Sequence, residues 1–153
     1  MDNLNIIAIR EQDIHSADLA FANFMMQTET YLNEKTTRNH QLYKTCNGTD
    51  LEKVAIDVLK EIAPSTPFRP ENIELVSGAR FPDIVAEHYY GVEVKSTKED
   101  NWKSTGSSIV ESTRIEDIFQ IYMLFGKLGG EMAQFKCKPY EDCLYNIAVT
   151  HSP

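Results

Sequence analysis

Apolar residues along the chain follow two different spacings, one typical of helices and one typical of strands. Three stretches carry apolar side chains three and four residues apart, as one face of a helix requires: 13–33, 50–63 and 114–128. Short apolar runs with the length of strands occupy five other stretches: 73–76, 84–85, 92–94, 132–138 and 143–150. The pattern therefore predicts an α/β protein with a central mixed sheet flanked by helices.

Capping and helix-breaking residues mark the ends of the predicted helices. Asp13 is a suitable N-cap for the first helix, and either Thr49 or Asp50 for the second. Pro64 ends the second helix, because proline cannot continue the backbone hydrogen bonding. Thr113 begins a capping-box pattern at the start of the third helix.

Three further segments carry weaker signals. Residues 4–9 are apolar but short, and predict either an edge strand or a lead-in segment. Residues 34–48 are polar and end in Asn-Gly, which favours a loop. The polar segment 99–108 contains Trp102, and is either a flexible loop that faces a substrate or a surface excursion with Trp102 packed on the core.

The most informative stretch is 80–98, which predicts two strands joined by a tight turn at Tyr90-Gly91. Side chains two residues apart in a strand share a face. Val92 and Val94 therefore point into a core, while Glu93 and Lys95 project together from the other face.

Asp83 opens the preceding strand, so the sheet can bring it alongside Glu93 and Lys95. Two carboxylates that converge with an ammonium group at the end of a sheet are a suitable site for a hard divalent cation beside a water molecule. This stretch predicts a metal-dependent hydrolytic site.

Composition is that of an ordinary globular protein. The chain has 153 residues, of which 42% are hydrophobic and 25% charged, so it is long enough for one domain, 1–153, with one sizeable core. No apolar run has the length of a membrane helix. Cys46, Cys137 and Cys143 are odd in number and scattered, which suits reduced thiols in a cytoplasmic protein.

The net charge of −8 weighs against a protein that coats nucleic acid without specificity. Carboxylates that bind a metal add negative charge for a separate reason, so acidity does not exclude a nucleic-acid substrate.

The motif Pro82-Asp83, nine residues, then Glu93-Val94-Lys95 resembles that of the PD-(D/E)xK nuclease superfamily. The predicted order α-β-β-β-α-β resembles the core of the same superfamily. The resemblance covers about 49–150, with 1–48 as a helical N-terminal extension. It is closest to type II restriction endonucleases, although the chain is shorter than most of them and is interpreted as a possible fragment.

This resemblance implies roles for particular residues. Asp83 and Glu93 would be metal ligands, and the backbone carbonyl of Val94 would complete the inner shell. Lys95 would orient or activate the attacking water. Glu52 corresponds to an acidic residue on the first core helix and is a further ligand candidate. The implied cofactor is Mg²⁺, for which Mn²⁺ can substitute.

The implied function is cleavage of double-stranded DNA by a homodimer, since two sites related by two-fold symmetry cut both strands of a duplex most simply. Lys98, Lys103 and Arg114 are candidate phosphate contacts, with a solvated surface as the equal alternative for each.

Three alternatives remain open at this point. The chain could be a repair or junction nuclease of the same superfamily, or a truncated, non-catalytic module that binds DNA or assembles with a partner. It could also be a structural domain in which Asp83, Glu93 and Lys95 never converge.

Overall fold

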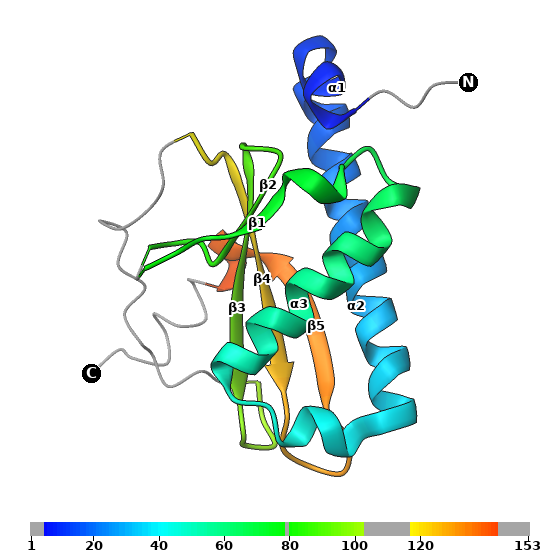
Figure 1. Cartoon of the computed structure of the whole chain (residues 1–153), viewed down its shortest axis with the longest axis vertical. Helices are drawn as coiled ribbons and strands as arrows, with labels where there is room; N and C mark the ends of the chain where they lie inside the picture. Colours follow the sequence, from blue (N-terminus) through cyan, green and yellow to red (C-terminus); the bar gives the residue numbers. More distant parts are fainter. Residues whose placement is uncertain (1–4, 79, 103–116, 144–153) are drawn as a thin grey trace.

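A computed structural model of the chain describes residues 5–78, 80–102 and 117–143. These residues form one five-stranded sheet, with the long helices on one side of it (Figure 1). The helices are α1 (Ile6–Gln12), α2 (Ile14–Lys44) and α3 (Gly48–Ile62), and two short 3₁₀ turns follow at Ala63–Ser65 and Pro70–Asn72. The strands are β1 (Ile73–Leu75), β2 (Ile84–Ala86), β3 (Tyr90–Thr97), β4 (Gln120–Lys127) and β5 (Gln134–Pro139).

The sheet is mixed, in the order β1-β2-β3-β4-β5. Only β3 and β4 run parallel, and the other neighbouring pairs are antiparallel. The predicted α/β class, with a mixed sheet flanked by helices, is therefore confirmed. Within the described residues, no helix is both long and apolar enough to span a bilayer.

The helix predicted over 114–128 is wrong for its described part, because Gln120–Lys127 is the strand β4. Ile121, Met123 and Phe125 are buried on one face of β4, while Leu124 is buried on the other. A strand that is apolar on both faces is a continuous apolar run, which matches helical spacing equally well. The expected cap at Thr113 and most of the strand predicted over 143–150 lie outside the described residues. Cys143, the first residue of that predicted strand, lies in a short helical segment.

The N-terminal part is more helical than its sequence indicates. Residues 6–12 form α1 rather than an edge strand. Most of the loop expected over 34–48 is helical, because α2 extends to Lys44 with a kink at Asn39. Asp13 is the N-cap of α2, as predicted. The apolar pattern fades after Leu32 because α2 then contributes few buried positions, among them Thr36 and Tyr43.

The predicted helix 50–63 is confirmed as α3, but its cap differs from the prediction. Asn47 is the N-cap, and it exchanges hydrogen bonds with Asp50 in a capping box. The helix therefore starts at Gly48, two or three residues earlier than a cap at Thr49 or Asp50 would place it.

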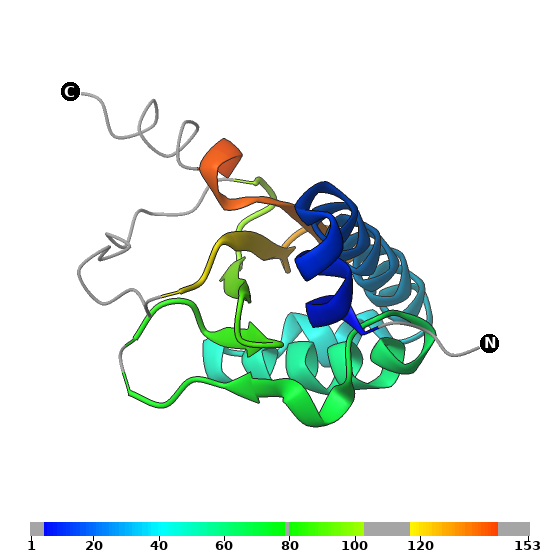
Figure 2. The same cartoon turned by 90° about the horizontal axis from the view of Figure 1, so that it is seen from above.

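The two faces of the sheet bury different sets of residues. α3 packs against β1 and β3, and α2 against β4 and β5, so both helices cover the same face (Figure 1 and Figure 2). Val92 and Val94 belong to the core beneath these helices, as predicted. The opposite face carries a smaller apolar cluster: Phe81, Ile118, Ile121, Met123, Phe125 and Tyr140.

The turn between β2 and β3 lies earlier than predicted. Ala86 pairs with Tyr90, and the turn residues Glu87 and His88 both have positive φ. Gly91 is already inside β3, where it pairs with Val85.

The outer edge of β5 is covered by side chains of α2. The side-chain amide of Asn33 donates to the carbonyl of Phe135 at 3.1 Å and accepts from its N–H at 2.8 Å. Glu29, one helical turn earlier, accepts from the N–H of Cys137 at 2.7 Å. Four helical residues span about 6 Å and two strand residues about 7 Å, so the two elements match in repeat. These contacts satisfy main-chain groups that an edge strand would otherwise expose.

We predict that Asn33→Ala lowers the free energy of unfolding by about 1–3 kcal/mol, because both main-chain groups of Phe135 lose their partner. Urea denaturation measures the change. Asn23→Ala is the matched control, since Asn23 is an exposed residue on the same helix. Equal stability of the two variants would show that the Asn33 contacts contribute nothing to the fold.

Candidate metal centre

Asp83 and Glu93 meet because of the register between β2 and β3. Ile84 pairs with Val92. Asp83, just before β2, therefore faces Glu93, the residue after Val92 in β3. The Asp83 N–H donates to Glu93 Oε1 at 3.1 Å, and the Val94 N–H donates to Asp83 Oδ2 at 2.9 Å. Each carboxylate is therefore held by the main chain of the neighbouring strand.

Lys95 completes the cluster from the same face of β3. Its Nζ lies 3.5 Å from Glu93 Oε2, and the side chains of Glu93 and Lys95 are only 8% and 24% exposed. The three residues predicted from the motif thus converge in one half-buried site. This geometry is inconsistent with the alternative in which they never meet.

The site is electrostatically unbalanced without a cation. Burial, together with repulsion from the nearby Asp83 carboxylate, raises the pKa of Glu93 to about 8, because Lys95 only partly opposes these two effects. Two carboxylates side by side in a buried place favour binding of either a proton or a metal ion.

Glu52 lies close enough to sense the same charges. Burial raises the pKa of Glu52, as does repulsion from Asp83, while Lys95 lowers it. Across the described ranges, however, no three His, Cys, Asp or Glu side chains gather at metal-binding spacing. The donors that actually converge are the two carboxylates of Asp83 and Glu93.

The main chain of Val94 contributes a third oxygen at the same edge. In a strand, the N–H and C=O of one residue point to the same side. Because the Val94 N–H is directed at Asp83, its carbonyl faces the same edge of β3. The resemblance implies that this carbonyl is a metal ligand, and that role stays a prediction.

Gly91 allows the strand carrying Asp83 to approach β3. A Cβ on Gly91 would lie 2.4 Å from Cγ of Pro82 and 3.3 Å from a methyl group of Ile118. Pro82 therefore packs directly on the Gly91 backbone, next to Asp83. Sequence reasoning assigned Gly91 to a turn and missed this contact, for which the sequence carries no separate signal.

Of the three predicted DNA contacts, only Lys98 lies within the described residues. Lys98 Nζ donates to the carbonyls of Lys44 and Cys46, both at 2.6 Å, so it caps the C-terminal end of α2. Lys103 and Arg114 lie outside the described residues. Trp102 packs on Phe125 with a ring-centroid distance of 6.0 Å, as the alternative of a tryptophan folded onto the core predicts.

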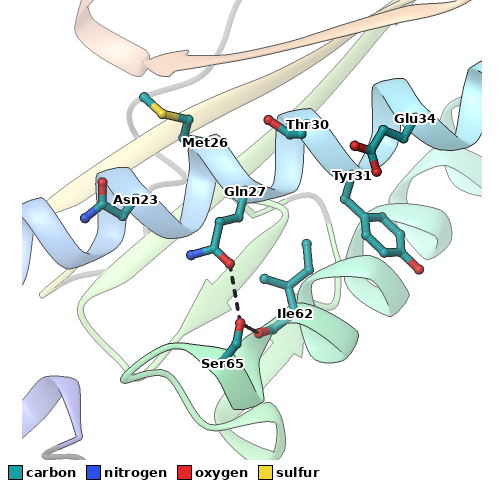
Figure 3. Close-up of a pocket in the computed structure, with 8 residues that line it drawn as sticks. All are labelled: Asn23, Met26, Gln27, Thr30, Tyr31, Glu34, Ile62 and Ser65. Carbon is teal, nitrogen blue, oxygen red and sulfur yellow. Dashed lines mark hydrogen bonds between the residues drawn. The ribbon is translucent and has the colours of Figure 1, made fainter.

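A pocket of about 590 Å³ lies elsewhere, between α2 and the end of α3 (Figure 3). Eight residues line it, none from the sheet: Asn23, Met26, Gln27, Thr30, Tyr31, Glu34, Ile62 and Ser65. Gln27 and Ser65 are hydrogen-bonded across it at 3.3 Å. Glu34 is the only acidic residue among these eight, so this pocket does not offer a pair of carboxylates like Asp83 and Glu93.

In comparisons with protein-family models, curated proteins and solved structures, nothing matches the chain. The functional argument therefore rests on the residues and their geometry.

We predict that Glu93→Gln stabilises the metal-free protein at pH 8 but not at pH 5. Folding raises the pKa of this carboxyl from 4.5 to about 8, so its contribution to stability is complete below about pH 4.5 and is lost as the pH rises to about 8. The variant, whose amide oxygen still accepts the Asp83 N–H, should gain about 1–4 kcal/mol over the wild type across this window.

Urea denaturation in EDTA at the two pH values measures this difference. Glu74→Gln, at an exposed position on β1, is the control and should show no such pH dependence. If the difference in unfolding free energy between Glu93→Gln and the wild type is the same at pH 5 and pH 8, the pKa of Glu93 is not raised by folding.

We predict that Gly91→Ala lowers the free energy of unfolding by about 1–3 kcal/mol, because the added methyl group displaces Pro82. The amide resonance of Val94 should shift as well, since its hydrogen bond to Asp83 depends on that packing. Gly48→Ala, where a Cβ meets nothing within 4 Å, is the matched control. If the Val94 amide resonance does not shift, the packing of Pro82 on Gly91 does not affect the hydrogen bond between Val94 and Asp83.

Proposed function

We propose that this protein is a metal-dependent endonuclease that hydrolyses phosphodiester bonds of double-stranded DNA, of the type II restriction class or its catalytic part. The observation that supports the proposal is the convergence of the Asp83 and Glu93 carboxylates with Lys95, whose Nζ is 3.5 Å from Glu93. The three motif residues and the mixed sheet support the proposal, whereas the second helix of the predicted α-β-β-β-α-β order is replaced by β4 over its described part.

The donors fit Mg²⁺. Asp83, Glu93 and the Val94 carbonyl offer hard oxygen atoms at one edge of β3, and Glu52 is a fourth candidate from α3. The raised pKa of Glu93 supports this choice, because Lys95 only partly offsets burial and the charge of Asp83. When bound, Mg²⁺ supplies positive charge that stabilises the developing negative charge on the phosphoryl oxygens.

The side chains of the protein have distinct roles in the proposed reaction. Asp83 and Glu93 would hold the cation, and each carboxylate is itself positioned by a main-chain hydrogen bond from the opposite strand. Lys95 is held beside Glu93 and orients the attacking water toward the phosphorus atom, or takes up its proton. Cleavage of both strands of a duplex implies a homodimer with one site in each subunit.

We predict that Lys95→Ala lowers Mg²⁺-dependent cleavage of plasmid and genomic DNA by at least about 100-fold. Gel electrophoresis of the products measures the rate. Lys60→Ala is the matched control, since Lys60 is exposed on α3 away from the acid pair, and it should cleave like the wild type. EDTA should abolish cleavage in every case.

The form of the products refines the proposal. Discrete fragments that disappear in Lys95→Ala indicate a sequence-specific nuclease, while a smear that disappears indicates a nuclease without that specificity. If no DNA is cut but calorimetry detects Mg²⁺ binding that Asp83→Ala removes, the chain is a non-catalytic module. If neither cleavage nor Mg²⁺ binding is observed, the proposal is wrong.

A further inference from the structure

Two lysines of β5 lie on the same face of the sheet as the acid pair. Across β4, the register aligns Lys95 with Phe125 and then Lys136. A parallel row runs from Glu93 through Met123 to Lys138. Directly paired residues of neighbouring strands project to the same face. Lys136 and Lys138 therefore share the face of Glu93 and Lys95, two strands away.

The spacing of these lysines suits a polyanion that extends from the acid pair. Neighbouring strands are about 4.8 Å apart, so the two rows place the lysines about 10 Å from β3. Along β5 the two lysines are about 7 Å apart. Phosphates of one DNA strand repeat about every 3.4 Å along the helix axis. The distance of about 10 Å between β3 and the lysines therefore corresponds to about three base-pair steps.

Both ammonium groups are available for such a contact. Lys136 and Lys138 are exposed, and neither forms an ion pair with any carboxylate in the described part of the chain. Lys136 Nζ lies 4.3 Å from the ring centroid of Trp102, which restrains the side chain without neutralising it. Lys127 also faces Trp102 but is bound to Asp100 at 2.8 Å, so its charge is already matched.

We propose that Lys136 and Lys138 contact the phosphate backbone of double-stranded DNA beside the acid pair. This inference rests on the proposed function for its choice of ligand, and it assigns the phosphate contacts to residues that sequence reasoning did not consider. Lys98, which was a candidate for that role, has its ammonium group on two carbonyls at the end of α2. The lysines of β5 give an acidic protein a local surface that attracts phosphate.

The test is the salt dependence of duplex binding by the Lys136→Gln/Lys138→Gln double variant. Fluorescence anisotropy of a labelled duplex oligonucleotide, in EDTA to prevent cleavage, gives the binding constant from about 50 to 200 mM KCl. The plot of log K against log salt has a negative slope, and each lost phosphate contact makes it shallower by about 0.9. The double variant should therefore have a slope about 1.8 shallower than that of the wild type. Both side chains are exposed, so thermal unfolding should match that of the wild type.

Lys53→Gln/Lys60→Gln is the matched control, because it removes the same charge from the exposed side of α3. It should keep the slope of the wild type. An unchanged slope in the β5 variant, an equal decrease in both variants, or no measurable duplex binding by the wild type would each overturn the inference.

These outcomes are distinguishable from failure of the proposed function, because binding is measured without metal and without cleavage. If the wild type cleaves DNA and the β5 variant binds the duplex with the same salt dependence, the nuclease proposal stands and the inference about Lys136 and Lys138 is wrong. If the wild type cleaves no DNA but the β5 variant has a shallower salt dependence of binding, the phosphate-binding surface is supported and the nuclease proposal is wrong.

Discussion

The structure depends on the reciprocal attachment of Asp83 and Glu93 across β2 and β3. Each carboxylate accepts a main-chain hydrogen bond from the other strand, at 3.1 and 2.9 Å. These bonds hold two negative groups together in a place that water reaches poorly. The same contacts that fix the strands therefore create an electrostatic cost, which raises the pKa of Glu93 to about 8. Stability lost at such a place is typical of functional sites, where a ligand compensates for it.

The rest of the fold places that pair and keeps it in register. Gly91 lets Pro82 pack on β3, so the chain enters β2 close enough for Asp83 to reach Val94. Lys98 anchors the far end of β3 to the corner between α2 and α3, and Glu52 lies in the first half of α3. Because α2 and α3 both cover one face, the acid pair, Lys95 and the lysines of β5 share the other face. Layering thus separates the main core from the polar chemistry.

Sequence reasoning performed best where local signals were redundant. The helix α3 has a strong apolar stripe, a cap and a terminating proline, and its prediction was accurate to within about one turn. β4 was mistaken for a helix because a central strand with two buried faces has no alternation to reveal it. The second half of α2 was mistaken for a loop because most of its side chains face solvent there, and a polar helix resembles a polar loop in sequence.

The sequence by itself determined the α/β class, the alternation that puts Glu93 and Lys95 on one face, and the three residues of the candidate site. The class and the shared face depend on neighbours within a few positions, where strand and helix geometry are nearly invariant, whereas the contact of Asp83 with Glu93 also needed the register between β2 and β3. Only the tertiary structure decided that Lys98 caps a helix, that Gly91 accommodates Pro82, and that Lys136 and Lys138 lie in line with the acid pair. Those relations join segments that are distant in sequence. They are set by strand order, register and packing, which one chain's local pattern does not encode.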